Sequence, residues 1–186
     1  NPSSGEYRFR GQSVSALEDA ELSRLRNQTF GFVFQQFHLL PELTAWENVA
    51  RPLQYAGVSR RERKERALDL LREFGLEHRS HHRPAQLSGG EQQMLAIGRA
   101  LMTNPHLLIL DEATEGLAPL VREDIWRCLD LLRAEGQTIL VIDKYVQRLQ
   151  ALADQHTLIE RGRVVWHGDS RALMAQPELW QRYLSV

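Results

Sequence analysis

The residues best suited to chemistry include a serine, two glycines and a glutamate in a row: Ser88, Gly89, Gly90 and Glu91. Two glycines let the backbone come close to a ligand, and the free N–H groups of a first helical turn point toward it with the positive end of the helix dipole. That geometry suits a phosphate group. An isolated Ser-Gly-Gly also fits a plain flexible turn, so the motif gains meaning only from its surroundings.

Two acidic residues form a second group. Asp111 and Glu112 directly follow Leu107 to Leu110, an apolar run with the length of a buried strand. At the carboxyl end of such a strand, an aspartate can hold Mg²⁺, usually through water, and an adjacent glutamate can polarise an attacking water. A capping pair at a strand exit is the alternative. Gln35 also follows an apolar strand and could offer a neutral oxygen to the metal or the water.

Three apolar runs of strand length would position these groups: Phe30 to Phe34, Leu107 to Leu110 and Thr138 to Ile142. Helical periodicity separates them, for example from Pro119 to Glu135. Fully apolar strands that alternate with helices predict a parallel sheet in an α/β fold, with the second and third runs buried on both faces.

The remaining sequence predicts helices and a hairpin around that sheet. Ser15 is placed to cap a helix over Leu17 to Arg26. The interleaved charges of Arg60 to Arg66 and the His and Arg residues of Glu77 to Arg83 predict solvated surfaces, although the three histidines of the second run could bind a metal. The other expected elements are a strand over Glu6 to Arg10, helices over Thr44 to Val49, Ser59 to Phe74, Ser88 to Met102 and Tyr145 to Ala153, a hairpin of His156 to Glu160 with Arg163 to His167, and two short terminal helices.

Composition narrows the class of protein. Of 186 residues, 42% are hydrophobic and 25% charged, which is ordinary globular material for about one domain. The net charge of -1 gives no indication of a nucleic-acid partner. Cys128, the single cysteine, excludes a disulfide within these residues and favours a reducing, cytosolic compartment. No apolar stretch reaches the roughly 18 residues of a membrane span.

The order and spacing of the motifs make their combination specific. Phe34-Gln35, then Leu87 to Glu91, then Leu107 to Glu112 follow one another along the chain. In this the sequence resembles the nucleotide-binding subunits of ATP-binding cassette (ABC) transporters over essentially its whole length. The resemblance implies a P-loop NTPase-like parallel sheet core with an inserted helical subdomain. It divides the chain into a partial ATPase core at 1–40, the helical subdomain at 41–86, and the signature helix with the remaining core and C-terminal helices at 87–186.

The resemblance also implies roles, with ATP and Mg²⁺ as cofactors. Gln35 is similar to the Q-loop glutamine, which serves both the metal and catalysis. The segment from Ser88 to Glu91 is similar to the nucleotide-binding signature motif. Asp111 is similar to the metal-holding Walker B aspartate, and Glu112 to the catalytic glutamate. In the family, ATP lies between the P-loop of one subunit and the signature of another. The implied partners are a second ATPase subunit, in a homo- or heterodimer, and transmembrane permease subunits that contact the helical subdomain. That arrangement places the chain peripherally on the cytoplasmic face of the membrane.

The chain departs from the family pattern at the P-loop. That loop needs Gly-Lys-Ser or Gly-Lys-Thr, but the only two lysines, Lys64 and Lys144, follow an arginine and an aspartate. The family places the P-loop and its strand in residues that would precede Asn1. The sequence therefore predicts an N-terminally truncated cassette that is inactive alone. A missing central strand would leave the apolar faces of Leu107 to Leu110 and Ile139 to Ile142 without a neighbour.

A second departure concerns the third strand. Lys144 stands where the family has its switch histidine. A lysine can reach a phosphate as a point charge, but it cannot both accept and donate a hydrogen bond as a neutral histidine does. The resemblance still gives Lys144 a catalytic position. Glu115 to Ala118 similarly occupies the place of the D-loop without its usual final aspartate.

Two parts of the chain resemble different subfamilies, and two other functions stay open. Residues 1–86 are similar to the ATPases of lipoprotein-release and macrolide-export systems, whereas the sequence from about Gln92 onward is similar to branched-chain amino-acid and urea importer ATPases. One alternative is a soluble ABC-type ATPase of DNA repair or translation, which usually carries long coiled-coil insertions or a second cassette. The other is a non-catalytic interaction fragment, which a hydrolysis assay distinguishes from the enzymes.

Overall fold

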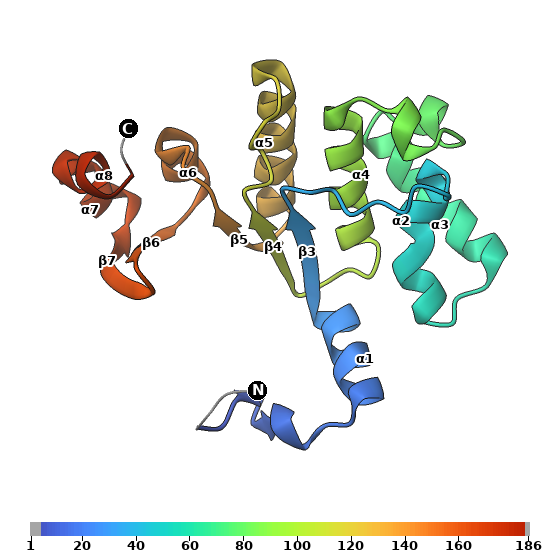
Figure 1. Cartoon of the computed structure of the whole chain (residues 1–186), viewed down its shortest axis with the longest axis horizontal. Helices are drawn as coiled ribbons and strands as arrows, with labels where there is room; N and C mark the ends of the chain where they lie inside the picture. The colour runs from blue at the N-terminus through green and yellow to red at the C-terminus, as the bar shows by residue number, and fades with distance from the viewer. Residues whose placement is uncertain (1–4, 185–186) are drawn as a thin grey trace.

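A three-stranded parallel sheet lies at the centre of the computed structural model, which describes residues 5–184 (Figure 1). The strands are β3 (Phe30–Phe34), β4 (Leu107–Asp111) and β5 (Thr138–Ile142), in the order β3-β4-β5. The three apolar runs thus form the predicted parallel sheet. Residues 1–4 of the predicted partial core lie outside the described residues.

One face of this sheet is covered by two helices, α4 (Gly89–Leu101) and α5 (Pro119–Ala134). Gly31 of β3 allows α4 to come close, because a Cβ there would lie 2.7 Å from the carbonyl oxygen of Ala100. Capping favours both helices, since Ser88 begins α4 and Pro119 is the first residue of α5. The buried core between helices and sheet includes Val33, Ala96, Ile97, Leu108, Leu110, Ile125 and Leu129.

The opposite face, which we call the bare face, is exposed in the described part of the chain. Phe32 in β3 and Leu140 in β5 are 43% and 48% exposed, and Ile142 is 50% exposed. The prediction of burial on both faces is therefore wrong for the third strand, because helices of residues 5–184 cover one face of the sheet only. Within the sheet, β4 pairs with β3 on one side and with β5 on the other.

A second core lies among the helices that precede and include α4. α2 (Ala45–Tyr55) and α3 (Arg60–Glu73) begin at the capping residues Thr44 and Ser59 and contact α4. Both fall within predicted segment 41–86, and α2 is longer than the sequence predicted. Two short 3-10 turns, η2 (Glu77–Arg79) and η3 (Pro84–Gln86), lead into α4. The apolar residues of this core are Ala45, Trp46, Val49, Ala50, Ala67, Leu71, Leu76, Leu87 and Leu95.

The N-terminal region differs from its prediction at the first helix. α1 (Asp19–Thr29) begins after Glu18, whose N–H donates to the Glu21 carboxylate at 3.1 Å. Ser15 does not cap this helix because it lies in the 3-10 turn η1 (Val14–Ala16). The expected strand near residues 6–10 is the short β1 (Arg8–Phe9), which pairs with β2 (Gln12–Ser13).

The C-terminal region follows its prediction, and Figure 1 shows it on the β5 side of the sheet. It contains α6 (Val146–Leu152), the antiparallel pair of β6 (Gln155–Glu160) and β7 (Arg163–Asp169), α7 (Ser170–Met174) and α8 (Pro177–Leu184). Within residues 5–184, none of the helices is both long and apolar enough to cross a bilayer.

Candidate functional site

The carboxyl ends of the three parallel strands meet at one edge of the sheet. Phe34, Asp111 and Ile142 lie side by side in the strand register, so the residues after them emerge together. Gln35 follows β3, and Lys144 follows β5 by two residues. The structure therefore brings Gln35, Asp111, Glu112 and Lys144, predicted from three separate segments, to what we call the strand-end edge; all four are exposed.

Glu112 leaves β4 with an unusual backbone conformation. Its φ of 50° lies in the left-handed region, which costs a non-glycine residue roughly 1–2 kcal/mol. Its N–H donates to the carbonyl oxygen of Ile142 at 2.8 Å, which fixes the turn across the ends of β4 and β5. A strained backbone at an exposed carboxylate is common at functional sites, where surrounding contacts hold the conformation.

A network of side chains joins the loops that follow β4 and β5. The buried Thr114 hydroxyl donates to Asp143 Oδ2 at 2.8 Å, and Asp143 Oδ1 accepts the N–H groups of Lys144 and Tyr145 at 2.7 and 3.1 Å. The Lys144 ammonium pairs with Glu115 Oε1 at 2.6 Å, and this partner raises the pKa of Lys144. The contacts of Thr114, Glu115 and Asp143 could not be predicted from the sequence, because nothing in their spacing indicates contact between the loops.

The segment after Gln35 is held at two points. Arg99 of α4 donates to the carbonyl oxygens of His38 and Phe37 at 2.6 and 2.9 Å. Burial lowers the pKa of the Arg99 guanidinium from its ordinary value. The fully buried Asn48 of α2 accepts the Leu40 N–H at 2.8 Å. These contacts connect the Gln35 segment with both α4 and α2.

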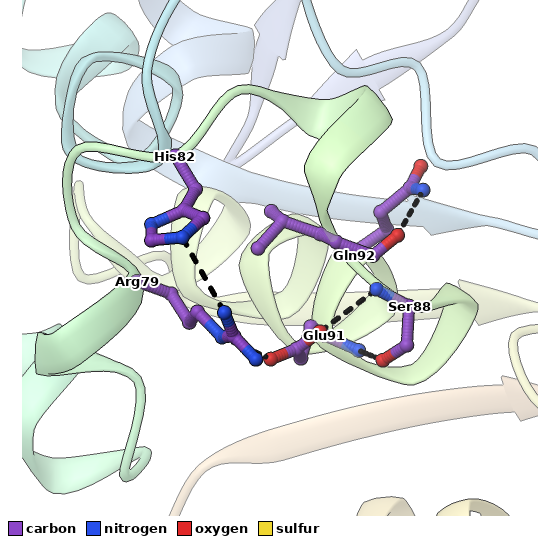
Figure 2. A network of polar contacts seen from close by, with 6 residues as sticks. Arg79, His82, Ser88, Glu91 and Gln92 are labelled. Atoms are coloured by element: carbon purple, nitrogen blue, oxygen red, sulfur yellow. Dashed lines mark hydrogen bonds and ion pairs between the residues drawn. The ribbon is translucent and has the colours of Figure 1, made fainter.

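The signature loop, Leu87 to Glu91, is closed by a reciprocal capping box (Figure 2). The Ser88 N–H donates to Glu91 Oε2 at 2.7 Å, and the Glu91 N–H donates to Ser88 Oγ at 3.2 Å. Gln92 supports the loop by donating from its side chain to the Leu87 carbonyl oxygen at 3.1 Å. Ser88 is therefore fixed as the N-cap residue of α4 and remains exposed to solvent.

The two signature glycines have different surroundings. A Cβ at Gly90 would lie 2.5 Å from Cγ1 of Val121 in α5, so glycine at this position permits close packing of the two helices. A Cβ at Gly89 would lie 3.4 Å from Leu117 and 3.8 Å from Phe37, which are ordinary contacts. From the sequence, close approach to a ligand was expected to explain both glycines. The structure supplies a packing reason for Gly90.

The His and Arg run before the signature loop is more than solvated surface. Arg79 Nε donates to Glu91 Oε1 at 2.9 Å, and its terminal nitrogen lies 3.3 Å from His82 Nε2 (Figure 2). Burial would raise the pKa of the Glu91 carboxyl, yet the Ser88 N–H and Arg79 hold it below its ordinary value. The prediction of a solvated surface is thus wrong for Arg79. Its contact with Glu91, twelve positions later, could not be predicted from the sequence.

The donors at the strand-end edge fit Mg²⁺ better than a metal held by protein alone. In the part of the chain that the structure describes, no cluster of three or more His, Cys, Asp or Glu side chains could hold a metal ion. Mg²⁺ keeps several waters and uses one or two carboxylates together with substrate phosphates. The exposed carboxylate of Asp111, with Glu112 and Gln35 beside it, matches that requirement.

Comparison with known proteins identifies close relatives. The model of the family described as ABC transporter matches residues 1–115. The macrolide export ATP-binding/permease protein MacB of Burkholderia pseudomallei (strain 1710b) is 45% identical over 165 residues, 89% of this chain and 25% of that protein. MacB of Photorhabdus laumondii is 38% identical over 191 residues, which cover all of this chain and 29% of that protein. The chain thus spans about a quarter of the length of these relatives.

Solved structures agree with the sequence comparison. The dimeric ATP-binding cassette MJ0796, in a post-hydrolysis state bound to ADP and Pi, superposes with a TM-score of 0.80 at 36% identity. The match covers 91% of this chain and 75% of that one. A second dimeric structure of MJ0796, described as a bacterial ABC transporter cassette, gives the same values.

Proposed function

This chain belongs to the ABC transporter family, and from that premise we propose that it is the ATP-binding, ATP-hydrolysing part of a transporter. The strand-end edge carries the proposal. Strand register brings Gln35, Asp111 and Glu112, and Lys144 to one edge of a parallel sheet, where ligands bind in α/β folds. The similarity to MJ0796, whose solved structure is bound to ADP and Pi, supports the same assignment.

Each residue of the edge has a proposed role. Asp111 would hold Mg²⁺ through water, and Gln35 would offer a neutral oxygen to the metal or the attacking water. Bound Mg²⁺ supplies charge that stabilises the phosphoryl group during transfer. Glu112 would orient a water and accept its proton, and the fixed turn at its backbone keeps the carboxylate at the strand end. Lys144 would provide a positive charge near the terminal phosphate.

Nucleotide binding also needs groups that these 186 residues do not contain. No Gly-Lys-Ser or Gly-Lys-Thr sequence is present to surround the β- and γ-phosphates. We therefore propose that Ser88, Gly89, Gly90 and Glu91 meet nucleotide bound on the P-loop of another ATPase subunit. The dimeric state named for the MJ0796 structures supports such an arrangement.

Residues 41–86 would contact a permease, the membrane-spanning part that the name of MacB includes. A groove of about 290 Å³ between α2 and α3 is the surface we assign to that contact. Trp46 lies in it, with Arg60 and Lys64 placed over its ring. A cationic groove with an aromatic side chain suits an apolar segment that carries acidic groups. The chain would accordingly sit on the cytoplasmic face of a membrane, with residues 1–40 and 87–186 as ATPase core.

Restoring a P-loop tests this function. We define the P-loop fusion as this chain preceded by the P-loop segment of a MacB cassette. The fusion should hydrolyse ATP in a Mg²⁺-dependent reaction, and the chain alone should not, because only the fusion has donors for the β- and γ-phosphates. Asp111→Asn should remove most of that Mg²⁺-dependent hydrolysis, because it removes charge from the metal site. Asp124→Asn, which changes an exposed carboxylate of α5, is the matched control. A folded fusion without activity would favour the non-catalytic interaction fragment.

A further inference from the structure

Arg79 connects two parts of the chain, the 3-10 turn η2 and the signature loop. Its guanidinium binds Glu91, the last residue of the signature loop, from a 3-10 turn twelve positions earlier. The Arg79 side chain is 37% exposed and that of Glu91 is 21% exposed, so this ion pair is partly screened from water. An ion pair in that environment orients its members more firmly than one on an open surface.

Glu91 divides its two carboxylate oxygens between two partners. Oε1 accepts from Arg79 at 2.9 Å, and Oε2 accepts the Ser88 N–H at 2.7 Å (Figure 2). Because one rigid carboxylate makes both contacts, the position of Arg79 determines how Glu91 presents its second oxygen to Ser88. The Ser88 amide is therefore held through Glu91 by a residue outside the signature loop.

The loop that carries Arg79 is also fixed to α2. The N–H of Ala45 donates to the His82 carbonyl oxygen at 2.8 Å, and the N–H of Trp46 donates to that of Ser80 at 3.1 Å. These are first-turn N–H groups of a helix, which have no partner within it. Hydrogen bonds thus connect the start of α2, the Arg79 loop, Glu91 and Ser88, and Trp46 also lines the proposed permease groove.

We propose that Arg79 is a positioning residue, which sets the signature serine Ser88 through Glu91 and links it to the start of α2. The inference rests on the proposed function, because it gives the proposed permease surface a physical connection to the residues that would meet nucleotide. Its physical part, control of Ser88 by Arg79, is a property of this chain without nucleotide and can be measured separately.

Residue-resolved hydrogen exchange on the 186-residue chain tests the link. Arg79→Gln should increase the exchange rate of the Ser88 amide by about 3-fold or more, since that N–H depends on the placement of Glu91. Arg79→Lys should give an intermediate rate, because one ammonium can still reach the carboxylate. The Gln92 amide, which donates to the Ser88 carbonyl within the helix, should keep its rate.

Arg72→Gln is the matched control. Arg72 pairs with Glu77 and Asp69 in the same region, but its side chain is 59% exposed and these partners lie outside the signature loop. It should leave the Ser88 rate unchanged. An unchanged Ser88 rate in Arg79→Gln, an equal effect of Arg72→Gln, or a parallel loss at Gln92 that reports an unwound helix would each overturn the proposal. None of these outcomes bears on ATP hydrolysis, which the P-loop fusion measures.

A pH profile distinguishes positioning from a merely structural contact. The pKa of Glu91 is lowered in the folded chain, so protection of the Ser88 amide should be present above the ordinary pKa and lost as pH falls through the lowered one. Arg79 and, beside it, His82 are the ionisable groups of this network. Arg79→Gln should move the loss of protection to higher pH, and an unmoved profile would contradict the inference.

Discussion

The signature loop and the strand-end edge differ in how many of their functional side chains are held by other side chains of the same chain. Ser88 and Glu91 bind each other, Arg79 binds Glu91, and α2 holds the loop that carries Arg79. At the strand-end edge, Gln35, Asp111 and Glu112 are exposed, although the backbone beneath them is fixed by sheet register and by the Glu112 N–H. One region is closed by its own side chains, while the other leaves its carboxylates exposed.

This difference indicates what each region can do without help. A preorganised loop can meet a ligand held elsewhere, because its geometry is already set. Exposed carboxylates need a metal and phosphates around them before they act, since charge in water is strongly screened. The chain should therefore contribute its signature loop to another subunit readily, whereas its own strand-end edge requires a P-loop.

The largest expected effect is on ATP hydrolysis and concerns Glu112 at the strand-end edge. In the P-loop fusion, Glu112→Gln should lower ATP hydrolysis by roughly 100-fold or more while ATP binding survives, because it removes the base but keeps the shape. Asp124→Asn should change turnover little. Near-full turnover in the Glu112→Gln fusion would mean that the base lies elsewhere.

A stability change should follow from the packing of the signature helix. Gly90→Ala should destabilise the chain by about 1–2 kcal/mol, because its Cβ would lie 2.5 Å from Val121. Gly89→Ala should cost less than about 1 kcal/mol or be neutral, since its contacts are ordinary. Urea denaturation measures both. Adding Val121→Ala to Gly90→Ala should recover part of the loss, and no recovery would mean that the two side chains do not conflict.

A third prediction concerns the bare face beside the strand-end edge. The chain should self-associate, because exposed apolar side chains on a parallel sheet with an open edge favour contact between copies. The double variant Phe32→Ser/Leu140→Ser should weaken that association by about 10-fold in sedimentation experiments. The reason is that burial of apolar area contributes roughly 25 cal/mol per Å² to the free energy of association. Leu131→Ser, on the exposed side of α5 at 63% exposure, serves as the control. A monodisperse monomer of the original chain would contradict the prediction.

The smallest effect is expected at Lys144. Its ammonium is paired with Glu115, and the pairing raises its pKa, so Lys144 stays charged up to and beyond its ordinary pKa. Lys144→Ala in the P-loop fusion should therefore lower turnover by less than about 10-fold, and the change should be constant between about pH 6 and 9. A loss as large as that of Glu112→Gln, or one that titrates in this range, would assign Lys144 a different role.

Local patterns in the sequence predicted most of the elements that form the site. Apolar runs indicated β3, β4 and β5, and helical periodicity indicated α3 and α4, which the structure shows to be capped by Ser59 and Ser88. Strand order then placed Gln35 and Asp111 together, because parallel strands share one carboxyl edge. These features depend on residues close in sequence or on general rules of α/β folds.

Features that depend on distant contacts could not be predicted in the same way. An apolar run does not reveal whether a second layer covers it, so the exposure of Phe32 and Leu140 was missed. Contact between Arg79 and Glu91, or between Lys144 and Glu115, requires two loops to meet in space. At Ser15 a local rule failed, because Glu18 and Glu21 offered the helix another cap.

Calorimetric titration of Mg²⁺-ATP into the chain and into the P-loop fusion tests the central claim most directly. The claim is that these residues carry a prepared signature loop and a catalytic edge, whereas tight nucleotide binding depends on a P-loop. Heat of binding with micromolar affinity should appear for the fusion and be absent for the 186-residue chain alone. Micromolar affinity of the chain alone, or none in a folded fusion, would contradict the account.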